Sequence, residues 1–243
     1  ATPPPAQIPL GPCPILQMFR AGRQSKAFCA SLGACKRAWQ WDLALGILEE
    51  LLHQGLEWAA VTCSLATSAC ERSREWERAL LLLSDLRQSH LQPDVVLYST
   101  AISACEKSRR LEPALRLLDD LLRDRLSPDI VVYGAAISAC EKCQQWQQAL
   151  VLLGDLRLRR LQPNAITYNA AISACEKSQE WEQALGLLRD LRQDRLQPTV
   201  ISYNAAVSAC EKCQEWVQAL RLLSELRTAE LLPDVVSYSA AIS

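Results

Sequence analysis

Apolar residues recur along this chain with the spacing of an α-helix, in two runs that a short polar segment separates. Between residues 165 and 199 the first run falls at i, i+3, i+4 and i+7: Tyr168, Ala171, Ile172 and Cys175. The second run keeps the same period: Trp181, Ala184, Leu185, Leu188 and Leu191. Stripes of this kind cover one face of a helix, so the pattern predicts two amphipathic helices joined by residues 178–180.

This plan repeats every 35 residues without an insertion. A cysteine and an alanine keep the register in six copies: Cys35, Cys70, Cys105, Cys140, Cys175, Cys210 and Ala44, Ala79, Ala114, Ala149, Ala184, Ala219. A tryptophan, a proline and a tyrosine keep it in five copies each, as in Trp181, Pro198 and Tyr203. Chance does not produce such a register, so the chain is a tandem array.

Each unit is predicted to be a helix, a turn and a second helix. Pro198 disfavours helix at Gln197, and the polar residue after each proline is a suitable N-cap for the next helix. A single helix pair cannot bury its apolar faces, whereas stacked pairs can, which predicts an all-α solenoid. We expect six units and the start of a truncated seventh: 25–59, 60–94, 95–129, 130–164, 165–199, 200–234 and 235–243. We expect further repeats or a partner to cover the C-terminal end.

Residues 1–24 differ from the array. Six of the 12 prolines lie between Pro3 and Pro14, which predicts an extended arm. Residues 1–41 contain no acidic residue. An acid-free leading segment is typical of what remains of an organelle transit peptide, or of what lies beside one. We therefore expect an organelle, the plastid ahead of the mitochondrion; the plain alternative is a chain shortened at this end.

Charge and composition narrow the function classes. Lys and Arg total 26 and Asp and Glu 27, so the net charge of −1 excludes a globally basic nucleic-acid binder but leaves room for a local basic stripe. Eight glycines and two histidines argue against a glycine-rich phosphate loop or a histidine metal cluster. The longest apolar run, residues 79–83, is too short to span a bilayer. We expect no cofactor, no metal, no small-molecule substrate and no transmembrane segment.

Small polar residues and a cation recur on another face of the first helix. Asn169, Ser173 and Lys177 lie at i, i+4 and i+8, and the stripe recurs in the other units. Regular cations suit a polyanion, and small residues let a ligand approach closely. The alternative is a solvated face whose lysine is favoured by the dipole at the helix C-terminus. Both interpretations stay open on the stripe alone, since a glutamate precedes each lysine.

The junction between units resembles the pentatricopeptide repeat (PPR) family. Its residues are Leu-x-Pro-Asp followed by two aliphatic residues, a variable residue and a Tyr, as in 91–98, 126–133 and 231–238. The Ala-Cys-Glu-Lys segment before the tryptophan is similar to divergent algal organellar members. The family often has glycine before the second helix and before the terminal proline. Here other residues occupy these two positions: Gln179, Gln214, Arg109 and Arg125, His90, Glu230.

The resemblance implies a right-handed superhelix whose concave face binds single-stranded RNA, one nucleotide per repeat. It implies that the fifth and last residues of a unit read the base: Ser64 with Asp94, Ser99 with Asp129, Gly134 with Asn164, Asn169 with Thr199, and Asn204 with Asp234. The second residue would pack on the base: Val61, Val96, Val131, Ile166 and Ile201. A late cation would meet phosphate: Arg72, Lys107, Lys142, Lys177 and Lys212. Splayed single-stranded bases expose the edges that such side chains can read.

The family's base preferences imply a register near G-G-N-Y-U, read 5′ to 3′ from the N-terminal side. Unit 25–59 carries Lys26, Cys29 and Ala59 at the three positions, so we expect it to cap the array.

The sequence gives weaker support to a zinc site and to base stacking by tryptophan. Cys140–Cys143 and Cys210–Cys213 are C-x-x-C pairs, but they lie two repeats apart, about 20 Å at ~10 Å per packed helix. One zinc ion with ligands at ~2.3 Å cannot bridge them. The tryptophan row could stack bases, but its place in the second apolar stripe favours core.

We see no catalytic constellation, so the leading hypothesis is a non-catalytic RNA-binding protein of organellar RNA processing, stabilisation or translation. The rival is an architectural scaffold that contacts protein subunits of a large organellar complex, such as a ribosome or a membrane-bound assembly. Near-neutral charge and nearly copied repeats favour the rival somewhat.

Overall fold

The computed structural model describes residues 67–68, 70–88, 92–229, 231, 235 and 237–238. This part of the chain is all-α. Its helices alternate between a first and a second helix of each unit: α5 Trp76–Gln88, α6 Val95–Lys107, α7 Leu111–Arg123, α8 Ile130–Lys142, α9 Trp146–Leu158, α10 Ala165–Lys177, α11 Trp181–Gln193, α12 Val200–Lys212 and α13 Trp216–Thr228. The predicted arm 1–24, unit 25–59 and the residues Val61, Ser64 and Asp234 lie outside the described residues.

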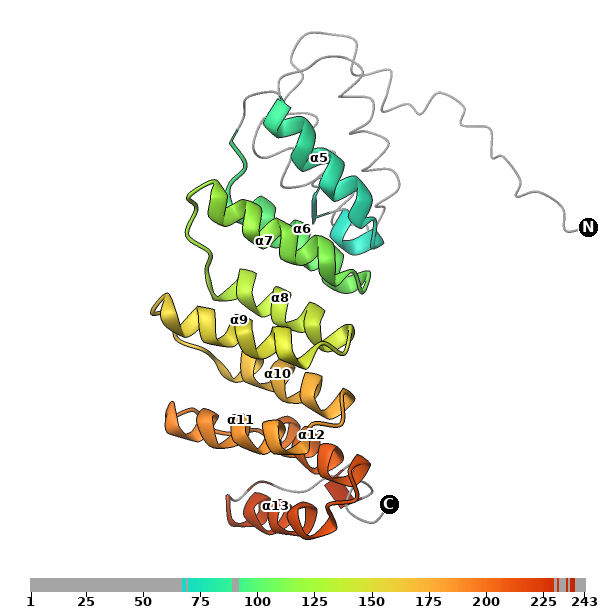
Figure 1. Ribbon diagram of the computed structural model, residues 1–243, viewed down its shortest axis with the longest axis vertical. Coiled ribbons are helices and arrows are strands. Elements are labelled where there is room, and N and C mark those ends of the chain that lie inside the picture. The colour runs from blue at the N-terminus through green and yellow to red at the C-terminus, as the bar shows by residue number, and fades with distance from the viewer. Residues whose placement is uncertain are drawn as a thin grey trace, which may run out of the picture.

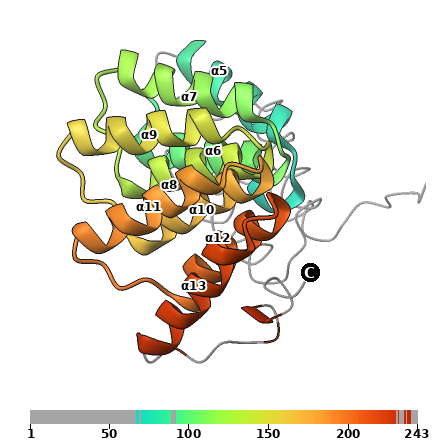
Figure 2. The same ribbon diagram turned by 60° about the horizontal axis from the view of Figure 1, so that its bottom comes forward.

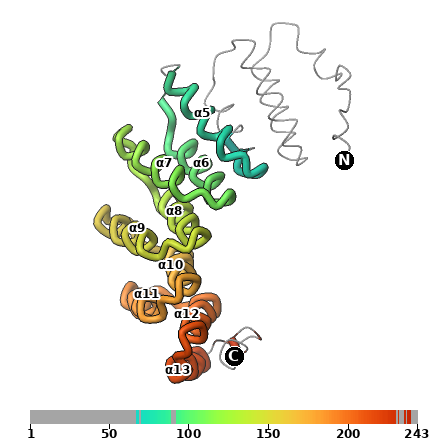
Figure 3. The backbone as a smooth tube through the Cα atoms, turned by 45° about the vertical axis from the view of Figure 1, so that its right-hand side comes forward, coloured from blue at the N-terminus to red at the C-terminus, as the bar shows by residue number. Residues whose placement is uncertain are grey.

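The helices form two layers that run the length of the stack (Figure 1). The first helices α6, α8, α10 and α12 pack one on the next and make the first-helix layer. The second helices α7, α9 and α11 form a layer beside the first helices (Figure 2), and in Figure 3 they make a column next to α6, α8, α10 and α12. Each second helix also bridges units, since α9 packs against both α8 and α10. The predicted all-α solenoid is therefore confirmed.

The core is the apolar stripe of each unit, repeated. Tyr168, Ile172 and Cys175 of α10 and Leu191 of α11 have no solvent-exposed surface. The small Ala and Cys side chains let neighbouring first helices approach closely, while the tyrosine ring fills the space between layers. Burial raises the pKa of the Cys175 thiol to about 12. These thiols act as small apolar groups, as the sequence predicts.

Two turns per unit hold a non-glycine residue in the left-handed region. After α10, Gln179 has φ 61°. The Glu180 N–H bonds the Cys175 carbonyl at 2.9 Å and the Gln179 N–H bonds the Glu176 carbonyl at 3.2 Å, which is a Schellman motif. The same conformation recurs at Arg74, Arg109, Gln144, Gln214, Arg125, Arg160 and Arg195. These are positions where the family that the sequence resembles often has glycine, so the departures in sequence leave the turns in place at a cost of ~1–2 kcal/mol each.

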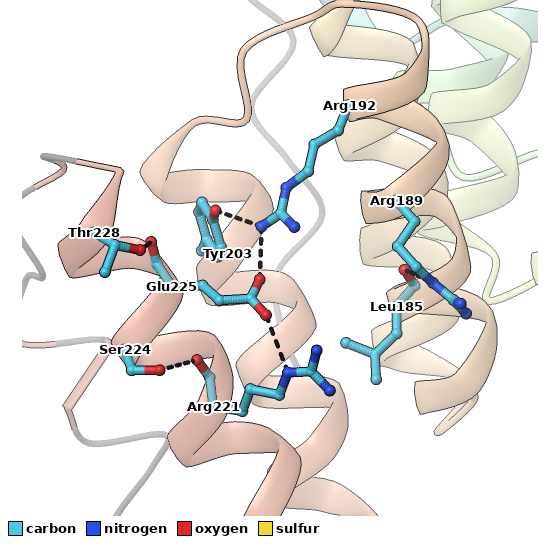
Figure 4. Close-up of polar contacts among 8 residues, drawn as sticks. All are labelled: Leu185, Arg189, Arg192, Tyr203, Arg221, Ser224, Glu225 and Thr228. Atoms are coloured by element: carbon cyan, nitrogen blue, oxygen red, sulfur yellow. Dashed lines mark hydrogen bonds and ion pairs between the residues drawn. The ribbon is translucent and has the colours of Figure 1, made fainter.

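The buried tyrosine of each first helix is anchored by charged residues of the second-helix layer (Figure 4). Tyr203 of α12 accepts a hydrogen bond from Arg192 of α11 at 2.6 Å, and Arg192 also bonds Glu225 of α13 at 2.7 Å. These two hydrogen bonds tie the helices α11, α12 and α13 together. Burial raises the pKa of the equivalent Tyr168, and its hydrogen bond to Asp194 adds to the rise.

Candidate nucleic-acid interface

A row of exposed aliphatic side chains follows the first-helix layer, one in each of the four units between residues 95 and 234. They are the second residues of their units, with exposed fractions of 58% at Val96, 59% at Val131, 70% at Ile166 and 64% at Ile201. The core does not account for them, because the apolar residues that follow on the same helices are buried. Exposed apolar surface gains about 25 cal/mol per Å² when a ligand covers it. The row therefore suits a ligand with regularly spaced apolar faces.

The last residue of each unit caps the first helix of the next. Asp94 accepts a hydrogen bond from the Leu97 N–H at 2.8 Å, and Asp129 accepts one from the Val132 N–H at 2.9 Å. Asn164 and Thr199 close reciprocal capping boxes with the third residue of the following unit. These residues thus have a structural role, while each aspartate keeps a second carboxylate oxygen for a ligand.

Asn169 and Thr199, a predicted base-reading pair, lie within hydrogen-bond distance. The Asn169 Nδ2 donates to the Thr199 Oγ1 at 3.3 Å. Ile166 and Asn169 are three residues apart on α10, so the aliphatic row and the polar pair share one helix face. The structure therefore brings together an apolar face and two small polar groups at this unit.

In the other predicted base-reading pairs of which both residues are described, no hydrogen bond joins the two. No hydrogen bond joins Ser99 to Asp129, although both are described. Gly134 has no side chain to reach Asn164, but a Cβ there would lie 3.8 Å from the Thr167 Cγ2, which is ordinary contact. Asn204 is half-buried in the same way as Asn169, and its partner Asp234 lies outside the described residues.

The lysines predicted to meet phosphate are each paired with a carboxylate of the preceding unit. The Nζ to Oε1 distances are 2.6 Å for Lys107–Glu71, 2.7 Å for Lys142–Glu106, 2.7 Å for Lys177–Glu141 and 2.9 Å for Lys212–Glu176. We call these pairs the Lys–Glu ladder. Exposed pairs of this kind contribute ~0–1 kcal/mol each, so a phosphate can compete for the lysine. The ladder nevertheless leaves this stripe neutral, and the remaining predicted cation, Arg72, is exposed before α5.

The C-x-x-C pairs have a structural explanation. The Cys143 Sγ donates to the Arg109 carbonyl at 3.4 Å and the Cys213 Sγ to the Gln179 carbonyl at 3.1 Å. Serine does the same in the unit between them, where the Ser178 Oγ donates to the Gln144 carbonyl at 3.1 Å. Among the described residues no cluster of His, Cys, Asp and Glu could hold a metal ion.

The tryptophans do not lie on the first-helix face. Trp76, Trp146 and Trp181 are half-buried and pack against the core, whereas Trp216 of α13 is 68% exposed. The predicted core role therefore holds for three of these four tryptophans and not for Trp216.

Two residues that the sequence analysis did not single out contact the predicted reading residues. The Ser202 Oγ donates to the Asn169 Oδ1 at 2.5 Å, and the Ser237 Oγ donates to the Asn204 Oδ1 at 2.5 Å. Each serine is the third residue of the next unit. The sequence holds a signal for them, since both asparagines are followed 33 residues later by a serine, whereas Ser99 is followed by Val132.

The pentatricopeptide repeat domain is the family whose model matches this chain, over residues 46–108, 116–178, 151–213 and 186–243. A single PPR repeat also matches residues 96–126. The comparison with curated proteins finds no match. No helix in the described part is both long and apolar enough to cross a membrane.

Solved structures show the same fold. The maize pentatricopeptide repeat protein PPR10 is 27% identical with a TM-score of 0.72, over 89% of this chain and 31% of its own. PPR10 in complex with an 18-nt psaJ RNA element is 24% identical with a TM-score of 0.58, over 92% and 37%. The PPR domain of Arabidopsis thaliana PRORP1 in complex with tRNA is 12% identical with a TM-score of 0.63, over 71% and 91%. The chain thus spans about a third of the length of PPR10.

Proposed function

Because the chain belongs to the pentatricopeptide repeat family, we propose that its first-helix layer binds single-stranded RNA without catalysis. The observation that carries the proposal is the shared face of Ile166, Asn169 and Thr199. It sets an exposed aliphatic side chain beside two small polar groups, and the aliphatic residue recurs in the four units between residues 95 and 234. The structures of PPR10 with an RNA element and of the PRORP1 PPR domain with tRNA support the proposal through likeness of fold.

The chemistry of the face suits unstacked bases. A base presents an apolar π-face, which an aliphatic side chain can cover, and a polar edge, which an asparagine amide or a hydroxyl can bond. The repeat then sets one base per unit. The proposed register is G-G-N-Y-U, with the pyrimidine at the unit of Asn169 and Thr199 and the uracil at the unit of Asn204 and Asp234.

Phosphate recognition has to compete with the Lys–Glu ladder. The five predicted cations, at ~0.7 counterion per contact, give a slope of log K against log salt of at most about −3.5. Any lysine that keeps its glutamate makes the slope shallower. We propose that the protein acts in an organelle, plastid or mitochondrion, on RNA processing, stability or translation.

The test is binding of a fluorescein-labelled RNA that contains 5′-GGACU-3′, measured by anisotropy over a salt series. The expected result is a negative slope and weaker binding of the same RNA held in a duplex, where its edges are paired. A slope near zero with equal binding of duplex and single strand would contradict the proposal.

A second candidate rests on the Lys–Glu ladder. A face whose four lysines are each paired with a glutamate also suits a protein partner, as in an architectural subunit of an organellar complex. Such a scaffold would bind no RNA in the anisotropy series. Cross-linking of the native particle would then join Lys177 to a polypeptide rather than to nucleotide.

A further inference from the structure

We propose that Ser202 is a positioning residue that orients the Asn169 amide and so sets the base preference of unit 165–199, with Ser237 doing the same for Asn204. This inference rests on the proposed RNA binding. It adds to the reading pair a third residue, which belongs to the next unit along the array. The base read by one repeat therefore depends on a side chain of its neighbour.

Asn169, Thr199 and Ser202 form a closed ring of hydrogen bonds. The Asn169 Nδ2 donates to the Thr199 Oγ1 at 3.3 Å, the Thr199 and Ser202 hydroxyls lie 3.1 Å apart, and the Ser202 Oγ donates to the Asn169 Oδ1 at 2.5 Å. A serine hydroxyl has one hydrogen. Since Ser202 gives its hydrogen to Asn169, the hydrogen between the two hydroxyls comes from Thr199. The ring thus runs in one direction.

The ring is held from outside by the backbone. Ser202 has no exposed surface, and its Oγ also accepts the Thr199 N–H at 3.0 Å. The Thr199 Oγ1 in turn accepts the Ser202 N–H at 3.3 Å. Because both hydroxyls are fixed by the helix cap, the asparagine amide that joins them cannot rotate without breaking a bond.

A fixed amide distinguishes bases that a free amide does not. After the ring is formed, Asn169 keeps one N–H and one lone pair of Oδ1 for a ligand. Uracil offers an N–H donor flanked by carbonyl acceptors, whereas cytosine offers a ring acceptor beside an amine donor. An amide free to turn over can pair with either order of donor and acceptor. An amide held at both ends presents a single order, so it prefers one of them.

Helix capping alone does not require the serine. Asp94 and Asp129 cap their helices although the third residues of those units are Leu97 and Val132. A hydroxyl at the third position bonds the fifth residue of the previous unit only where that residue is asparagine. Thr167 is also buried and also closes a capping box, but it faces Gly134, which has no amide to orient.

The test measures base discrimination at one nucleotide. Anisotropy titrations use the RNA 5′-GGAXU-3′ with X as A, C, G or U, and the wild-type protein, Ser202→Ala, Ser202→Thr and the control Thr167→Val. We expect Ser202→Ala to reduce the preference at X by about fivefold or more, the size of a lost bidentate base contact. We expect Thr167→Val to leave it unchanged.

Rescue separates positioning from packing. Ser202→Thr keeps the hydroxyl that Ser202→Ala removes. The added methyl group has room: in the preceding unit, where Thr167 occupies the equivalent position, a Cβ built at Gly134 would lie 3.8 Å from the Thr167 methyl, which is ordinary contact. We expect this variant to regain the preference at X. The melting temperatures of Ser202→Ala and Thr167→Val should fall by similar amounts, because both lose a cap hydrogen bond.

A second measurement does not need RNA. The side-chain amide cross-peak of Asn169 in a ¹H–¹⁵N spectrum, assigned with Asn169→Ala, should move in Ser202→Ala and not in Thr167→Val. An unmoved cross-peak overturns the ring. If Ser202→Ala keeps the wild-type preference at X, this inference is wrong, whereas the proposed function is unaffected. Wild-type protein that binds none of the RNAs overturns both.

Discussion

Replacing Gln179 by glycine should stabilise the array, because this residue sits in a left-handed turn. Its φ is 61°, and its side chain is exposed and makes no hydrogen bond in the described structure. The left-handed conformation costs a non-glycine residue ~1–2 kcal/mol. Glycine removes that cost but loses ~0.5–1 kcal/mol of chain entropy on folding. The expected gain in unfolding free energy is therefore ~0.5–1 kcal/mol.

Gln183→Gly is the matched control. Gln183 is exposed inside α11, where glycine is unfavourable by ~0.5–1 kcal/mol. The same change of side chain should thus shift stability in opposite directions at two positions only four residues apart. The backbone contacts of the turn are unaffected, since the Gln179 carbonyl that accepts from Cys213 belongs to the main chain.

The assay is urea unfolding followed by far-ultraviolet circular dichroism. A repeat array does not unfold strictly in two states, so midpoints are compared between variants with equal slopes. Adding Gln144→Gly and Gln214→Gly should give roughly additive gains, because the sites are in different units. A Gln179→Gly midpoint below that of the wild type would refute the left-handed turn as the source of the cost.

Three further outcomes are expected. Gly134→Asn should create base discrimination of about fivefold at the third nucleotide, because a Cβ there meets only the Thr167 methyl in ordinary contact. Anisotropy titrations measure this discrimination, and equal binding of all four bases would contradict the prediction. Lys177→Gln should make the salt slope shallower by clearly less than ~0.7, and a change of the full ~0.7 would show that Glu141 does not compete for the lysine. Asp194→Asn should lower the melting temperature at pH 7. The Tyr168 hydrogen bond holds the folded pKa of Asp194 below its usual ~3.9, so this stabilisation is present above that value and is lost as pH falls through the folded pKa. A difference in melting temperature that does not shrink as the pH falls below ~3.9 would contradict it.

The register of the repeat was enough to predict the helices and the core. The proline that closes one unit and the capping residue after it place the start of α10 at Ala165, and the apolar stripe identifies Tyr168 and Cys175 as buried. These are contacts within a unit, where local spacing decides which side chains share a face. The family resemblance identifies two positions per unit where glycine is usual, and the turns keep their shape there without glycine.

The cross-unit contacts could not be predicted in the same way. Glu176 precedes Lys177 in sequence, but adjacent residues on a helix do not face each other, and Lys177 pairs with Glu141 instead. The Ser202–Asn169 bond joins residues of two units and depends on how closely α10 and α12 stack. The sequence of a single repeat does not predict the distance between two stacked helices.

The exchange of one reading pair for another tests the RNA-binding face most directly. Asn169→Ser with Thr199→Asp gives unit 165–199 the pair found at Ser99 and Asp129. Titration against RNA that varies only at the fourth nucleotide should show the preference there change from pyrimidine to guanine, with the other positions unaffected. If the doubly substituted protein keeps the wild-type order of affinities, the first-helix layer does not read bases.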